Sequence, residues 1–155
     1  MRLQVSTRLA IFAILELTAR DGRHLSVAEI GEKYGVSSHH LAKVMHVLGR
    51  AGLVRSIRGA GGGFQFSGNA RRTTLLDVVQ LFEDLTAVDE GAAAGDATRE
   101  ERTLSEVLGE IDDIARATLG SITIATLRKL VDRRPAANGQ HLKTGVSRRR
   151  SSPRP

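Results

Sequence analysis

The stretch SVAEIGEKYGVSSHHLAKVMHVLGR, residues 26–50, decides the predicted fold. Ser26 and Glu29 form the S-x-x-E pattern of a capping box, which predicts the start of a helix that Gly35 ends. Ser37 is the N-cap of a second helix, in which apolar residues recur with the i, i+3, i+4, i+7 spacing of one helix face. Two helices joined by so short a turn must cross at a steep angle, which is the helix-turn-helix arrangement.

A plain helical hairpin is the alternative, and it satisfies fewer of the features of this stretch. Gly31 is small where the two backbones approach, and Gly35 suits a left-handed turn. The apolar residues expected to hold the two helices together are Ile30, Tyr34, Val36, Leu41 and Val44.

A glycine-rich hairpin is predicted directly after the second helix. Residues 53–57 read as a short strand, and residues 58–63, RGAGGG, form a turn before the aromatic run at residues 64–66. In this position the hairpin is a wing. The glycines match neither a Walker loop, because no Gly-Lys-Ser/Thr follows, nor a dinucleotide fingerprint, because no helix follows.

Further helices are predicted on both sides of this unit. Residues 5–19 are apolar most of the way round a helix, which indicates burial on more than one side. Thr74 and Asp77 cap another helix, whose apolar stripe reaches Leu85. An Ala/Gly/Asp loop is predicted for residues 86–98.

A long amphipathic helix is predicted over residues 100–119, with Gly120 ending it. Its apolar residues repeat with 4-3-4-3 spacing, which is typical of a helix that packs against another helix. Residues 123–131 predict a last short helix, although residues 122–124 can also be read as a strand. The apolar seam of the long helix comprises Leu104, Leu108, Ile111, Ala115 and Thr118, widened by Val107 and Ile114.

Charge is unevenly distributed along the 155 residues, which contain 23 Lys and Arg, 17 Asp and Glu and no cysteine. Residues 1–72 carry a formal charge of +7, residues 73–132 carry −8, and residues 133–155 carry +7. A basic block on a folded domain is the pattern expected of a nucleic-acid binder. The lack of cysteine excludes disulfide frameworks, Cys-ligated zinc, cysteine nucleophiles and thiolate-held iron–sulfur clusters.

The second helix of the predicted helix-turn-helix has an apolar face and an opposite polar face, as a DNA-recognition helix requires. A solvated polar face is the alternative.

His39 and His46 lie roughly 10 Å apart along the helix axis and cannot share a metal ion, so no metal site is predicted. At the wing, Arg58 would enter the minor groove. The polar face comprises His39, Lys43, His46 and Arg50, and base contacts are expected from Ser38, His39, His40 and Lys43.

No catalytic motif is evident, because the sequence has no G-x-S-x-G and its paired carboxylates read as ordinary helix surface. The longest early apolar run, residues 9–15, is too short to span a bilayer, and no signal-peptide cleavage pattern follows it. The sequence therefore predicts a cytoplasmic protein that is not an enzyme and makes no membrane contact.

The sequence resembles the Rrf-two family of bacterial winged-helix regulators, of the NsrR/IscR type. The resemblance rests on the opening MRL, on the helix-turn-helix stretch and above all on RSIRGAGGGFQF at residues 55–66. Residues 37–48, SSHHLAKVMHVL, are most similar to the NsrR branch. Residues 74–85, TLLDVVQLFEDL, match the helix that follows the wing, and the long helix matches the family's dimerisation helix.

The resemblance implies a mainly α fold with a small β-hairpin wing, acting as a homodimeric repressor on a palindromic operator. Cluster-binding members carry three cysteines in the region matching residues 86–108, which has none here, and Arg8 stands where some members have an acidic ligand. We therefore predict no iron–sulfur cluster and no other cofactor. Ala42 replaces the family's frequent acidic or polar specificity residue. DNA contacts carried over by position are Ser38, His39, His40, Lys43, Arg58 and Gly59.

We accordingly divide the chain into three parts. Residues 1–85 form a winged helix-turn-helix DNA-binding domain, residues 86–132 form a loop and dimerisation helices, and residues 133–155 form a disordered basic tail. The expected partners are double-stranded DNA and a second copy of the chain. The alternative is a protein-interaction module, or a heterodimer partner, that uses the same fold without an operator of its own.

Overall fold

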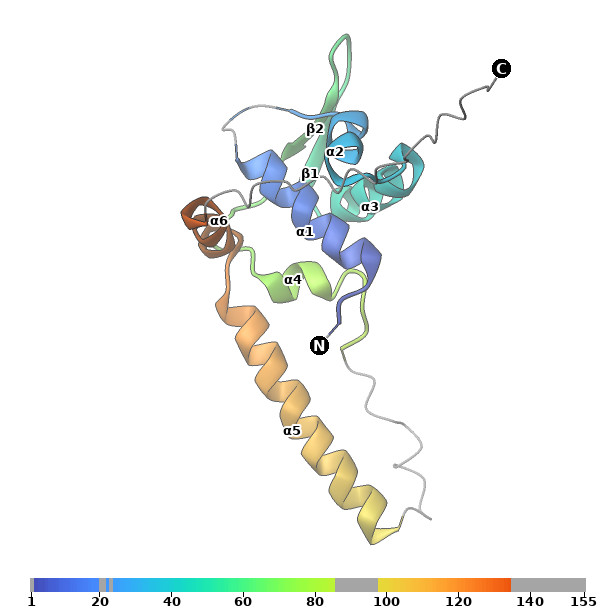
Figure 1. Cartoon of the computed structure of the whole chain (residues 1–155), viewed down its shortest axis with the longest axis vertical. Helices are drawn as coiled ribbons and strands as arrows, with labels where there is room; N and C mark the ends of the chain where they lie inside the picture. The colour runs from blue at the N-terminus through green and yellow to red at the C-terminus, as the bar shows by residue number, and fades with distance from the viewer. Residues whose placement is uncertain (1, 20–21, 23, 86–97, 135–155) are drawn as a thin grey trace, which may run out of the picture.

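The computed structural model describes residues 2–19, 22, 24–85 and 98–134. The predicted loop up to residue 97 and the basic tail from residue 135 therefore lie outside the described residues. Within them the fold is mainly helical with one two-stranded antiparallel hairpin, which confirms the predicted fold class (Figure 1). The elements are α1 (Val5–Thr18), α2 (Val27–Tyr34), α3 (Ser38–Arg50), β1 (Val54–Ile57), β2 (Gly63–Phe66), α4 (Leu75–Val79), α5 (Arg99–Ser121) and α6 (Ile124–Arg133).

The predicted signals of the helix-turn-helix are confirmed. Ser26 Oγ accepts a hydrogen bond from the Glu29 backbone N–H at 3.2 Å, and the Glu29 carboxylate accepts one from the Ser26 backbone N–H at 2.8 Å. Gly35 ends α2 in the left-handed region, with φ of +64°, where glycine carries no Cβ penalty. At Gly31, a Cβ would lie only 2.7 Å from the carbonyl oxygen of Val36 in the turn, so the close approach of the turn to α2 requires glycine.

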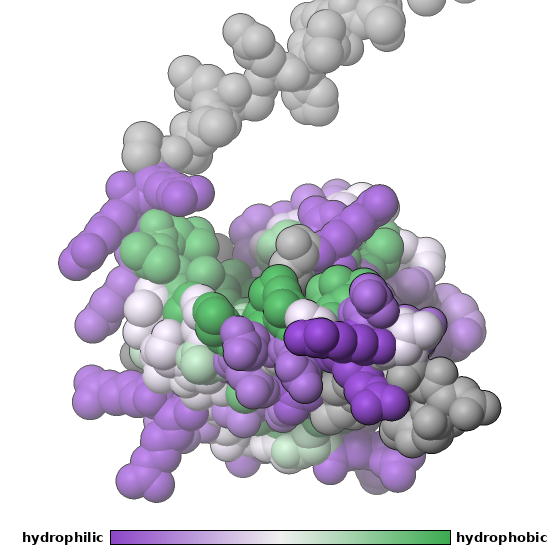
Figure 2. Space-filling model, turned by 90° about the horizontal axis from the view of Figure 1, so that it is seen from below, coloured by the Kyte–Doolittle hydropathy of each residue, from purple (hydrophilic) through white to green (hydrophobic). Residues whose placement is uncertain are grey.

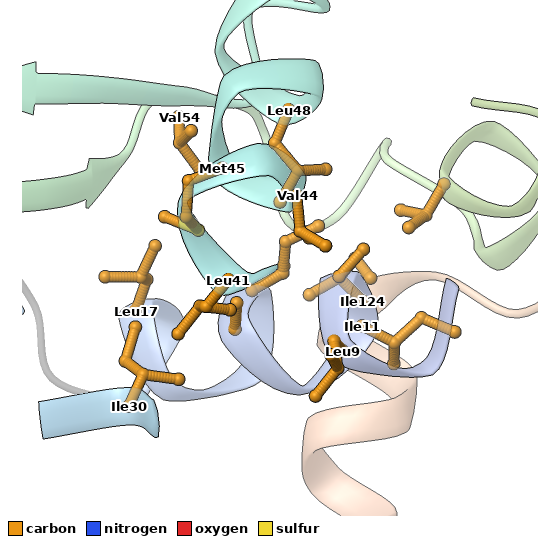
Figure 3. Packing of buried hydrophobic residues seen from close by; sticks show 14 residues of the cluster. Leu9, Ile11, Leu17, Ile30, Leu41, Val44, Met45, Leu48, Val54 and Ile124 are labelled. Atoms are coloured by element: carbon orange, nitrogen blue, oxygen red, sulfur yellow. The ribbon is translucent and has the colours of Figure 1, made fainter. Parts of the chain in front are cut away.

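The core forms where α3 crosses α1 (Figure 3). Leu41, Met45 and Leu48 of α3 are fully buried, because helical spacing puts them on one face. The same hydrophobic cluster contains residues of α1, α4 and α6, together with Ile30 of α2 and Val54 of β1. This packing fixes α3 against the domain through its apolar face and leaves its other face outward.

A polar cluster joins α2 to α1 at the edge of this core. Tyr34 Oη donates to Glu16 Oε1 at 2.7 Å, and Lys33 forms an ion pair with the same carboxylate. The rings of Phe12 and Tyr34 stack with centroids 4.9 Å apart. Burial, followed by the hydrogen bond to Glu16 and its negative charge, raises the pKa of the Tyr34 phenol above its usual value. The phenol therefore stays protonated and remains a donor to Glu16.

The hairpin is anchored near its turn by the chain that precedes α2. In the hairpin Val54 pairs with Phe66 and Ile57 with Gly63. Phe64 also exchanges backbone hydrogen bonds with Leu25, at 2.8 and 3.0 Å, which adds a bridge beside β2. Figure 1 shows the loop of this hairpin extending beyond the helices.

The C-terminal helices depart from prediction in two places. The helix that begins after Thr74 was expected to reach Leu85, but α4 ends at Val79, so its predicted length was wrong. The prediction that Gly120 ends the long helix was also wrong, because α5 continues to Ser121. Gly120 does not have the positive φ of a helix-ending glycine, and a Cβ added there would lie 3.6 Å from the Leu76 side chain of α4.

The chain returns to the N-terminal core after α5. Ile124, the first residue of α6, is fully buried in the same hydrophobic cluster as α1. Backbone bonds from Leu75 to Ile122 and from Ile124 to Thr73 fix this return, at 2.8 and 2.9 Å. Residues 122–124 combine the predicted strand and the predicted helix. Thr123 forms an isolated β-bridge with Thr74, and it also caps the start of α6. The helix ends at Arg133, the first residue of the predicted tail.

Candidate nucleic-acid interface

The outward face of α3 is polar and cationic. Ser37 caps the helix, accepting a hydrogen bond from the His40 backbone N–H at 3.2 Å. Because Leu41, Val44, Met45 and Leu48 face the core, the polar residues between them are turned to solvent. The exposed side chains of this face are Ser38, His39, Lys43, His46 and Arg50, and Ala42 lies exposed among them.

His40 differs from the other predicted contact residues of α3. Its side chain is half-buried, and Nε2 lies 3.3 Å from Ser6 Oγ of α1. The start of α3 is thereby linked to the start of α1. The structure brings Ser38, His39 and Lys43 onto one exposed surface, whereas His40 lies toward its edge.

The tip of the wing presents Arg58 and Gly59 to solvent, as a DNA-contacting wing requires. Gly59 has φ of +111°, a conformation that side chains rarely adopt, so glycine is needed there for the turn itself. His24 supports the tip through a hydrogen bond, since its Nε2 lies 2.5 Å from the Gly61 carbonyl oxygen. Since a carbonyl only accepts, His24 Nε2–H is the donor in this contact.

Arg55 is a further cation of the wing that sequence reasoning missed. It is exposed on β1, and its Nε and Nη2 donate to Gln65 Oε1 at 3.0 and 2.7 Å. Arg55 and Gln65 are direct cross-strand partners, and such pairs interact on one face of a hairpin. The register of the two strands, counted back from the glycine turn, would have predicted this pair. The two hydrogen bonds to Gln65 hold the Arg55 guanidinium in one orientation.

An apolar surface lies far from this polar one, on α5, which has no buried residue. The exposed fractions reach 55% at Ile111 and 67% at Ile114. Figure 2 views the molecule from the end at which α5 projects in Figure 1, and hydrophobic residues reach the surface there among hydrophilic ones. The large exposed apolar residues of α5, which we call the α5 apolar face, are Leu104, Val107, Leu108, Ile111 and Ile114.

A winged helix-turn-helix with an outward cationic helix face is a fold of DNA-binding regulators. The sequence matches the family described as Rrf2, iron-dependent transcriptional regulator, over residues 3–130. The chain belongs to the Rrf2 family. A protein of Rhodopseudomonas palustris named as HTH-type transcriptional regulator BadM is 47% identical over 154 residues, covering 98% of this chain and 96% of that protein.

Solved structures agree with the assignment to Rrf2. The structure of CymR, the global cysteine regulator of B. subtilis, has a TM-score of 0.71 and 26% identity, covering 84% of this chain and 98% of that one. T. potens IscR has a TM-score of 0.67 and 25% identity, covering 90% and 94%. This Rrf2 protein is a DNA-binding transcriptional regulator, which confirms the prediction that it is not an enzyme. No helix among its described residues could cross a membrane.

Proposed function

We propose that the protein is a homodimeric repressor that binds a palindromic operator without an iron–sulfur cluster. The observation that carries this proposal is the outward polar face of α3 beside the wing. The start of α3 would enter the major groove, with Ser38, His39 and Lys43 near base edges. Lysine can bond the guanine acceptors, while serine and histidine can both donate and accept. A bound dimer would repress by excluding other proteins from the same DNA.

The wing supports the second part of this interface. Arg58, which is exposed at the tip, would enter the minor groove, where the negative potential is enhanced, and Gly59 would let the turn approach the phosphates. His40 stays among the proposed contacts, at the edge of the surface. Arg55, fixed by Gln65, adds a backbone contact.

The α5 apolar face supports the homodimer. Its five large side chains follow helical spacing, and a contiguous exposed apolar surface of this kind marks an interface. A second α5 carries the same pattern, so two copies can cover each other symmetrically. Two recognition helices related by a two-fold axis then read two half-sites, which is why the operator should be palindromic.

The side chains of this protein do not suit an iron–sulfur cluster, although the family is described as iron-dependent. Iron–sulfur clusters are held by cysteine thiolates, and the sequence has no cysteine. Within the described ranges, no three His, Asp or Glu side chains are grouped to hold a metal ion. The proposed regulator therefore responds to something other than the state of a thiolate-held cluster.

Colourless protein is the expected result of anaerobic purification. Thiolate-to-iron charge transfer gives clusters their visible absorption, and no thiolate is available here. The measurement is a visible spectrum together with iron analysis of the purified full chain. Stoichiometric iron with visible absorption would contradict the proposal, whereas trace iron that a chelator removes without changing operator binding would agree with it.

Operator binding is tested with a Lys43→Ala, Arg58→Ala double variant. Genome-wide mapping of bound DNA identifies the operator, and titration then measures its affinity. Each lost contact is worth about 1–3 kcal/mol, so we expect the double variant to bind roughly 100-fold more weakly at each half-site. The matched control is Arg133→Ala with Arg134→Ala, which removes the same charge from the exposed end of α6.

Salt dependence separates this proposal from a protein-interaction module. Affinity for the operator should fall steeply with salt, because phosphate contacts release counterions. An unchanged affinity in the Lys43, Arg58 variant, or a complex insensitive to salt, would overturn the proposed interface.

A further inference from the structure

A cavity of about 650 Å³ opens on the surface between the end of α1, β2, residues 68–71 and α6. Its accessible apolar lining includes Phe66, Ala70 and Ala125, which are half-buried, whereas Leu17 and Ile124, which also line it, are buried. The volume is that of a small-molecule site, and the wall offers the apolar surface that such sites use for affinity.

The charged residues around this cavity are predominantly cationic. Arg128 is already occupied, because its Nε lies 3.7 Å from Asp132 Oδ2 and its Nη2 donates to the Ala19 carbonyl oxygen at 2.9 Å. Arg71 and Lys129 also line the cavity, and neither has an acidic partner among the described residues. Two unpaired cations beside an apolar wall match an anion that carries a hydrocarbon body.

We propose that this cavity binds a small organic anion, a carboxylate with an apolar body. The body packs against Phe66 and Ala125, and the carboxylate accepts charge-assisted hydrogen bonds from Arg71 and Lys129. A neutral ligand of the same shape gains the packing and lacks the ionic bonds. A small hydrophilic anion gains the ionic bonds and lacks the packing.

The position of the cavity connects it to the wing. Gln65 lines the cavity and also accepts both hydrogen bonds from Arg55. Phe66, the next residue of β2, lies in the same wall and pairs with Val54. An occupant that shifts β2 or Gln65 therefore alters the orientation of Arg55. The binding itself is independent of the operator, whereas this regulatory consequence rests on the proposed function.

The test uses the full chain without DNA and compares hexanoate with hexanamide, which differ in charge and hardly in shape. Binding is followed by calorimetry and by backbone amide shifts in NMR spectra. We expect hexanoate to bind about tenfold or more tightly than hexanamide, and acetate to bind more weakly than hexanoate. The largest shifts should fall at Phe66, Ala70 and Ala125, and the Arg55 Nε–H signal should move with them.

An Arg71→Gln, Lys129→Gln variant provides the decisive comparison. Both side chains are exposed, so the variant should fold, and it should lose about tenfold in hexanoate affinity with little change for hexanamide. Arg133→Gln with Arg134→Gln is the matched control, since it removes two cations from the exposed end of α6 that do not line the cavity, and its hexanoate affinity should equal that of the parent. Equal binding of hexanoate and hexanamide, or unchanged hexanoate binding in the double variant, would overturn the site. Either failure would leave the operator result untouched.

Discussion

Ile111→Asp should convert the proposed dimer into a monomer and weaken operator binding by about 100-fold or more. Ile111 lies in the middle of the α5 apolar face and is 55% exposed, so the aspartate is solvated in the single chain. In a symmetric dimer the two aspartates would be buried together without a cation, which is strongly unfavourable. Losing the second half-site also loses the gain of bivalent binding, which reaches 10²–10⁴. Analytical ultracentrifugation and operator titration measure the two effects.

Gly109→Asp is the matched control for this variant. Gly109 lies about 160° around α5 from Ile111, and a Cβ at this position would meet nothing within 4 Å. The control should keep the mass of a dimer and the operator affinity of the parent. A dimeric Ile111→Asp protein with parental affinity would show that the α5 apolar face has another use.

Leu41→Ala should lower the free energy of unfolding by about 2–5 kcal/mol, a large share of the roughly 5–15 kcal/mol of a typical domain. Leu41 is fully buried at the start of α3, and its loss leaves a cavity in the core (Figure 3). Urea denaturation followed by circular dichroism gives this free energy.

Leu130→Ala is the comparison at equal protein concentration. Leu130 is 48% exposed on α6, and its truncation should change stability by only about 0.5 kcal/mol. Equal unfolding midpoints for the two variants would contradict the buried position assigned to Leu41.

The parts of the fold that could be predicted from the sequence depend on local chemistry. The capping box of Ser26 and Glu29, the turn at Gly35 and the cap at Ser37 each involve residues within a few positions of one another. Their hydrogen bonds are the same whatever surrounds them, so local pattern was sufficient. The division of α3 into two faces follows from its spacing alone in the same way.

The wrong predictions arose where distant residues decide the conformation. After Val79 the chain leaves the helix, and Glu83 accepts hydrogen bonds from Thr7 Oγ1 at 2.5 Å and from the Gln4 backbone N–H at 2.8 Å. Arg116 of α5 donates to the carbonyl oxygen of Leu85. These partners lie tens of residues away in the sequence, and periodicity contains no information about them.

For the candidate site, the sequence predicted which residues contact DNA, and the structure added the contacts that these residues make within the protein. The exposure of Ser38, His39 and Lys43 agrees with a recognition face, and their contacts with DNA stay a prediction. The link of His40 to Ser6 and the support of the wing tip by His24 required the three-dimensional fold. The division of the chain at residues 85 and 132 also stays a prediction.

The lack of any buried residue in α5 has a consequence for how the protein behaves as its amount changes. In the proposed dimer the α5 apolar face leaves water only on association, so the energy gained there depends on protein concentration through mass action. At low concentration the chain would be both less stable and less able to occupy two half-sites. Synthesis and degradation of the protein would thereby set occupancy of the operator more steeply than a monomer would allow.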